Sequence, residues 1–160
     1  KSKNVLFLPQ YYHYNNPGCN SKKLKEYFNI VEQLLLKGYK VLLKDHPKIS
    51  VNDYLSLYFK NNHNIINLSE INNFPVELFL SDLNIELVFS VYSTTLLSAS
   101  SSIFNLPVFT SYKMLQERIN SFSLYPSIIC NLIKKTLPDL NDFLSYYRSD
   151  AKDYYKKFIN

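Results

Sequence analysis

The chain has 160 residues, 46% of them apolar, with a net charge of +5 at neutral pH. This length and composition suit one globular domain and argue against disorder, and no stretch is apolar for long enough to cross a bilayer. Lysines and arginines are scattered along the chain, so an anionic ligand is favoured but nucleic acid is not an expected partner. Cys19 and Cys130 show neither metal-binding spacing nor a disulfide framework, which indicates reduced thiols in a cytoplasmic protein.

The first third of the chain predicts a strand, a loop, a helix and a second strand. Residues 4–9 form an apolar run that Pro9 ends, because proline cannot donate to a central ladder. Residues 10–20 are predicted as a long polar and aromatic loop with a turn at Asn16-Pro17-Gly18, and such a loop is a candidate for ligand binding. Residues 21–37 have helical spacing, with Gly38 as the C-terminal stop, and residues 39–44 are the next strand.

The remaining elements continue the alternation of helices and strands. The expected elements are a short helix at 51–60, a strand at 64–68, a helix at 75–81 that begins with proline, a strand at 86–89, a helix from Ser93 to about Asn105, and a strand at 108–110. Beyond Tyr112 the pattern is helical, with breaks at Pro126 and Pro138. We therefore predict one domain over 1–160, an α/β, Rossmann-like parallel sheet with helices on both faces and a helical tail from about residue 113.

Polar residues follow three of the predicted strands. They are the loop that begins at Gln10, the turn Lys44-Asp45-His46-Pro47-Lys48, and the run from Ser90 to Thr95. Ligands bind outside the carboxyl ends of strands in open parallel sheets, so these segments should meet at one edge. Ser93, Thr94 and Thr95 at a helix start could surround a phosphate, although plain N-capping by serine and threonine is the simpler alternative.

The histidine in the second of these segments has two interpretations. A histidine by itself is more often structural than functional. Here Pro47 disfavours helix at His46 and holds it extended, and Lys44 and Lys48 flank the pair. Together with the hydroxyl-rich helix start, this pattern favours an anion-binding site.

The same residues carry a resemblance to a known family. Leu43-Lys44-Asp45-His46-Pro47, followed by Phe89-Ser90-x-x-Ser93-Thr94-Thr95-Leu96, resembles the paired motifs of bacterial sialyltransferases with the two-domain GT-B fold. Capsule polysialyltransferases and lipooligosaccharide sialyltransferases both carry such motifs, in the C-terminal domain that binds the CMP part of CMP-sialic acid. The resemblance runs from about residue 4 to 112. Teichoic-acid or capsule glycerophosphotransferases have similar motifs and are an alternative, as is a non-catalytic nucleotide-binding module.

The resemblance implies roles for named residues. His46 would be catalytic, as general acid or electrostatic clamp on the phosphate leaving in an inverting transfer. The residues expected to bind the donor CMP-sialic acid are Pro47, Lys44, Ser90, Ser93, Thr94, Thr95, Gln10 and Glu70. Glu70 would accept from ribose hydroxyls, although a solvated surface glutamate is at least as good an interpretation. No cofactor is expected and no metal is required.

One motif of these enzymes is missing. Their general base lies in an acidic Asp/Glu-Asp/Glu-Gly motif, whereas neither Gly18 nor Gly38 follows a carboxylate. We therefore expect this chain to be the C-terminal, donor-binding half. The half that binds the acceptor glycan would lie upstream.

The tail interleaves aromatic residues with lysines over residues 139–160. This pattern fits an interfacial helix that touches anionic lipid at the inner face of the cell membrane. It also fits a helix that packs its aromatic side chains on the domain, which is the interpretation we favour.

Overall fold

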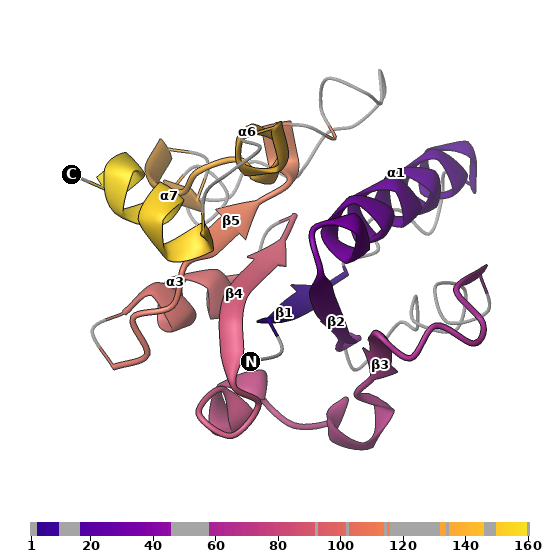
Figure 1. The fold of residues 1–160 in the computed structure, drawn as a ribbon, viewed down its shortest axis with the longest axis horizontal. Coiled ribbons are helices and arrows are strands. Elements are labelled where there is room, and N and C mark those ends of the chain that lie inside the picture. The colour runs from indigo at the N-terminus through magenta and orange to yellow at the C-terminus, as the bar shows by residue number, and fades with distance from the viewer. Residues whose placement is uncertain are drawn as a thin grey trace.

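The computed structural model describes residues 3–9, 17–45, 58–91, 93–101, 103–113, 115, 132–133, 135–145 and 150–159, with the backbone alone for 17–21 and 159. Five strands form one sheet in which every pair is parallel: β1 (Lys3–Leu8), β2 (Tyr39–Leu43), β3 (Ile65–Asn67), β4 (Ile85–Ser90) and β5 (Val108–Thr110). Their order across the sheet is β3-β2-β1-β4-β5 (Figure 1). The predicted parallel α/β fold is confirmed.

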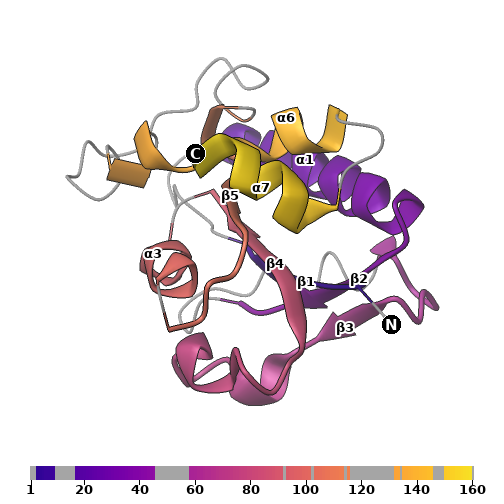
Figure 2. The same cartoon turned by 60° about the vertical axis from the view of Figure 1, so that its left-hand side comes forward.

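Helices cover both faces of this sheet. The helices α1 (Pro17–Leu36), α6 (Leu140–Ser145) and α7 (Ala151–Ile159) lie over one face (Figure 2). The other face carries α3 (Thr94–Ser100) and the 3-10 turn η2 (Val76–Phe79), while a second 3-10 turn, η1 (Ser69–Ile71), follows β3. Because strand side chains alternate between faces, each central strand supplies both layers of the core.

The core on the α1 side is built around aromatic rings. Phe7 of β1 lies opposite Phe89 of β4 in the strand register, and their rings stack with centroids 4.2 Å apart. Tyr27 of α1 meets Phe7 edge-on at 5.0 Å. Each of these three residues is at most 1% exposed. The apolar strand runs of the sequence thus correspond to burial on both faces of a parallel sheet.

The strand predictions are confirmed, with shifts at the ends. The first helix, by contrast, begins earlier than residue 21, because Pro17 and Gly18 belong to α1. The predicted turn at Pro17-Gly18 is therefore wrong. Proline suits the first position of a helix, because an N–H at that position would have no partner within the helix. At the other end Gly38 has a φ of +81° and its N–H donates to the Leu35 carbonyl at 2.9 Å, which confirms the predicted stop.

Two other helices are shorter than predicted. Residues 75–81 contain only the 3-10 turn η2, and Pro75 precedes it in an extended conformation (ψ 128°). The helix that follows Ser93 ends at Ser100 instead of near Asn105, because Ser101 is extended (ψ 164°). Within that helix the Ser100 hydroxyl donates to the Leu97 carbonyl at 3.0 Å. Serines compete in this way for backbone groups and make poor helix interiors.

Aromatic residues of α6 and α7 pack on the domain. Tyr154 and Tyr155 of α7 lie against the core, and the Tyr154 ring is 5.7 Å from that of Phe143. Lys156, Lys157 and Phe158 are exposed. None of the described helices is long and apolar enough to cross a membrane.

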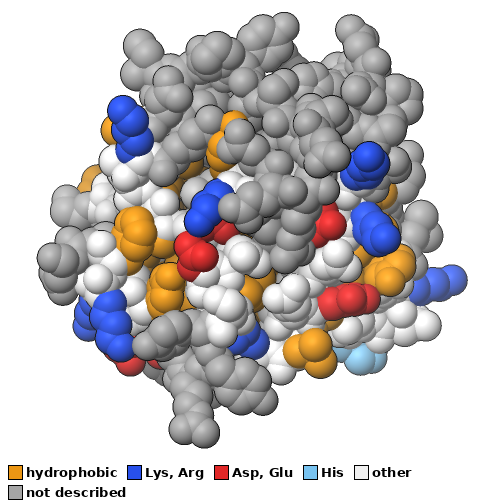
Figure 3. Space-filling view, turned by 90° about the horizontal axis from the view of Figure 1, so that it is seen from above, with side chains coloured by type: hydrophobic (Ala, Val, Ile, Leu, Met, Phe, Trp, Pro, Cys, Tyr) orange, Lys and Arg blue, Asp and Glu red, His pale blue; other side chains and the backbone are white. Residues whose placement is uncertain are grey.

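Positive charge is not gathered in one patch on the face shown in Figure 3. Lysine side chains of the described residues lie at several places on this face, with neutral and acidic side chains among them. The predicted short helix at 51–60 and the helical segment around Pro126 fall mostly outside the described residues.

Candidate functional site

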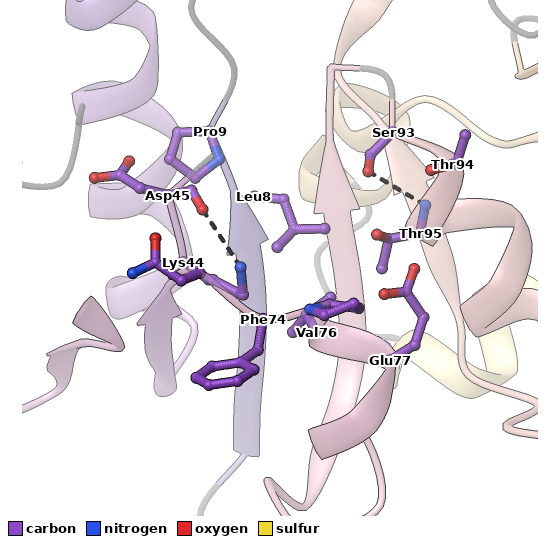
Figure 4. Close-up of a pocket in the computed structure, with 12 residues that line it drawn as sticks. Leu8, Pro9, Lys44, Asp45, Phe74, Val76, Glu77, Ser93, Thr94 and Thr95 are labelled. Atoms are coloured by element: carbon purple, nitrogen blue, oxygen red, sulfur yellow. Dashed lines mark hydrogen bonds between the residues drawn. The ribbon is translucent and has the colours of Figure 1, made fainter. Parts of the chain in front are cut away.

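A pocket of about 320 Å³ opens where the chain leaves β1, β2 and β4 (Figure 4). The strand order reverses at this point: β2 and β3 follow β1 on one side, and β4 and β5 lie on the other. Crevices of this kind, outside the carboxyl ends of the strands, are where open parallel sheets bind ligands. The lining residues are Leu8, Pro9, Lys44, Asp45, Asn73, Phe74, Pro75, Val76, Glu77, Ser93, Thr94 and Thr95.

Lys44 supplies a buried cation to this pocket. The residue is only 6% exposed, and its ammonium donates to the carbonyl oxygens of Asp45 at 3.5 Å and Asn72 at 3.3 Å. An ammonium has three N–H groups, so these contacts, the ones described for it, leave a donor for a ligand. Burial lowers the pKa of Lys44, and the negative charges of Glu77 and Asp45 partly oppose that shift. A bound anion would therefore favour the charged form of this lysine.

The hydroxyl-bearing run forms the opposite wall. Ser93 is the N-cap of α3, and its Oγ accepts from the Thr95 N–H at 3.2 Å. N-capping, the simpler alternative for this serine, is thus what the structure has. The Ser93 hydroxyl proton is not consumed by that bond, and Thr94 is exposed beside it. Both residues face the same pocket as Lys44, as the sequence predicted.

Of the other predicted donor-binding residues that the structure describes, Ser90 and Glu70 do not line the pocket. Ser90 is fully buried and its hydroxyl donates to the Leu8 carbonyl at 2.8 Å, which ties the end of β4 to the end of β1. Glu70 lies exposed on η1 and is not one of the lining residues. Gln10, His46 and Pro47 lie outside the described residues, although His46 directly follows the lining residue Asp45 in the sequence. Donor binding by Ser90, Glu70, Gln10 and Pro47 remains a prediction, as does the catalytic role of His46.

The segment from Asn73 to Glu77 was missed by sequence reasoning. Its first three residues enter the pocket between η1 and η2, and Val76 and Glu77 enter it from the start of η2. Phe74 is 54% exposed at the pocket margin, and Figure 4 shows the Glu77 carboxylate beside Thr95. A large aromatic directly before a proline, after two asparagines, was the available signal in the sequence. Among the described residues no cluster of three or more His, Cys, Asp or Glu could hold a metal ion.

Comparison with known proteins gives one family match. The model of the alpha-2,8-polysialyltransferase (POLYST) family matches residues 1–113. A search of the curated proteins found no match. Among solved structures, a variant of the wall teichoic acid polymerase TagF is similar at 15% identity and a TM-score of 0.46. That alignment covers 99% of this chain, which spans only 39% of the polymerase. Because the family model covers well over half of its 160 residues, the chain belongs to the alpha-2,8-polysialyltransferase family.

Proposed function

We propose that this chain is the donor-binding domain of an inverting sialyltransferase that uses CMP-sialic acid and has a GT-B architecture. The observation that carries the proposal is the pocket that groups Lys44 with Ser93 and Thr94 in a chain of this family. The family description suggests a growing glycan that ends in sialic acid as the acceptor. We propose a glycan of the cell surface, such as a capsule, as the product. The acceptor would be bound by a further domain outside this chain.

The charges of the pocket suit the phosphate of such a donor. CMP-sialic acid contains a phosphodiester, which carries one negative charge. The Lys44 ammonium would meet it from the β2 side, and the Ser93 and Thr94 hydroxyls would donate from the start of α3. Hydrogen bonds to charged groups contribute about 1.5–3 kcal/mol each, so two or three of them would account for useful affinity.

The reaction would proceed by direct displacement. A base in the acceptor-binding domain takes the proton of the acceptor hydroxyl, and that oxygen forms a bond to the anomeric carbon of sialic acid. The bond from this carbon to the phosphate oxygen breaks, and CMP leaves with the electron pair. The charge that develops on the phosphate is stabilised by Lys44, Ser93 and Thr94, while His46 donates a proton or hydrogen bond to it. Attack on the face opposite the leaving group inverts the anomeric centre.

Substitution of Lys44 tests whether the phosphate lies at this cation. Lys44→Met keeps the unbranched part of the side chain and removes the ammonium group with its charge, so we expect CMP affinity to fall about 10- to 100-fold. Binding of cytidine, which lacks the phosphate, should stay nearly unchanged. Isothermal titration calorimetry of both ligands against the 160-residue chain measures the difference.

The matched control is Lys60→Met, which removes the same charge from an exposed position outside the pocket. It should leave both affinities unaltered. A Lys44→Met variant that binds CMP as tightly as the parent chain, or that weakens CMP and cytidine equally, would contradict the assignment of the phosphate to Lys44. Thermal unfolding of each variant checks that the fold is retained.

A further inference from the structure

The Phe74 side chain borders the pocket and is more exposed than a large aromatic usually is. It lies at the pocket margin and is 54% exposed. Figure 4 places its ring on the Lys44 side, across the pocket from Ser93 and Thr94. We propose that the Phe74 ring is the surface on which the base of the bound nucleotide stacks. This inference rests on the proposed function. It adds a residue that binds the uncharged base of the nucleotide, at the end away from the phosphate.

The backbone holds Phe74 in a defined position. Its N–H donates to the Ile71 carbonyl at 3.0 Å, which closes the turn after η1. Pro75 follows, and the proline ring disfavours a helical conformation of the residue before it. The ring also meets that of Phe79 nearly at right angles (73°), with centroids 6.4 Å apart. A ring that is already held in place loses little conformational entropy when a ligand binds. Less of the stacking free energy is then lost to ordering the side chain.

The arrangement of the lining fits a nucleotide in one direction. The hydroxyl groups suited to the phosphate lie at the α3 side, and aliphatic groups of Leu8, Pro9 and Val76 line the space between them and the β2 side. In a nucleotide the base lies at the end away from the phosphate. With the phosphate held between the Lys44 ammonium and the Ser93 and Thr94 hydroxyls, the base would extend to the margin where Phe74 lies. Aromatic stacking contributes affinity with little choice among bases, because every base has a π-face.

Leu78 allows a test of the alternative that Phe74 belongs to a surface covered by another part of the protein. Leu78 is 67% exposed on η2 but does not line the pocket. If Phe74 were exposed only because another part of the protein covers this region, both residues would belong to that contact surface. Nucleotide binding would then depend on neither of them.

The experiment compares three ligands and three variants of the 160-residue chain by calorimetry. The ligands are CMP, UMP and ribose 5-phosphate, which keeps the phosphate and sugar but has no base. The variants are Phe74→Ala, Phe74→Tyr and the matched control Leu78→Ala. We expect Phe74→Ala to weaken CMP and UMP by similar factors, about 10- to 100-fold, and to leave ribose 5-phosphate unchanged. Phe74→Tyr should retain affinity, and Leu78→Ala should resemble the parent chain.

The outcomes separate this inference from the proposed function. If the parent chain binds CMP and Phe74→Ala binds it equally well, stacking on Phe74 is wrong while the proposed function stands. Equal losses for CMP and ribose 5-phosphate would also overturn the stacking role, since the ring would then support the pocket and not the base. A parent chain that binds none of the three ligands contradicts the proposed function itself.

Discussion

Replacement of His46 by alanine should lower the rate of sialyl transfer by about 10²–10⁴-fold in an enzyme that also contains the acceptor-binding domain. His46 follows Asp45, and Asp45 lines the pocket that also contains Lys44 and Ser93. A proton or hydrogen bond donated to the departing phosphate matters most as charge develops there, so the loss should appear in kcat more than in KM. Steady-state transfer rates from CMP-sialic acid to a sialylated acceptor measure this effect.

His63→Ala is the control, because His63 is an exposed histidine that does not line the pocket. It should leave the transfer rate unaltered. The pH profile gives a second readout: a limb due to His46 should disappear in His46→Ala and persist in His63→Ala. If His46→Ala unfolds the domain, or leaves both CMP binding and turnover intact, the histidine is structural and its catalytic role is excluded.

Phe89→Ala should lower the free energy of unfolding by about 3–5 kcal/mol. Phe89 is completely buried in β4, where its ring stacks on Phe7 at 4.2 Å. It also lies opposite Phe109 of β5 in the register. Removal of the Phe89 ring therefore leaves a cavity that the neighbouring strands cannot fill, because backbone hydrogen bonds of the sheet hold them in place. A loss of this size is a large share of the roughly 5–15 kcal/mol typical of folded domains. Urea unfolding followed by circular dichroism measures it.

Ile103→Ala provides the comparison for this substitution. Ile103 is 82% exposed, so its truncation should change the free energy of unfolding by less than about 0.5 kcal/mol. A Phe89→Ala variant that loses under about 1 kcal/mol would show that this ring is not part of a close-packed core.

Much of the sheet could be predicted from the sequence because its strands are buried on both faces. Short, continuous apolar runs such as Leu87-Val88-Phe89, bounded by polar turns, are typical of fully buried strands. The convergence of Lys44 with Ser93 and Thr94 followed from topology alone, since parallel strands bring their carboxyl ends to one edge. That part of the site needed no knowledge of side-chain contacts.

The rest of the site depended on tertiary contacts that local sequence does not encode. Lysines at strand ends are usually solvated. Lys44 is buried instead, because β2 lies between two other strands and the Lys44 ammonium donates to the Asn72 carbonyl. Ser90 has the sequence context of a ligand-binding serine, yet the register places its hydroxyl against the Leu8 carbonyl. Phe74 and Glu77 belong to irregular and 3-10 segments without a repeating pattern, so only the folded chain brings them to the pocket.

Titration of the parent 160-residue chain with CMP, UMP and AMP under identical conditions tests the central claim most directly. We expect CMP to bind most tightly of the three, and cytidine, without the phosphate, to bind more weakly than CMP. Equal affinity for the three nucleotides, or no binding of CMP at concentrations where the fold is intact, would contradict the claim that this pocket is a CMP-sialic acid site.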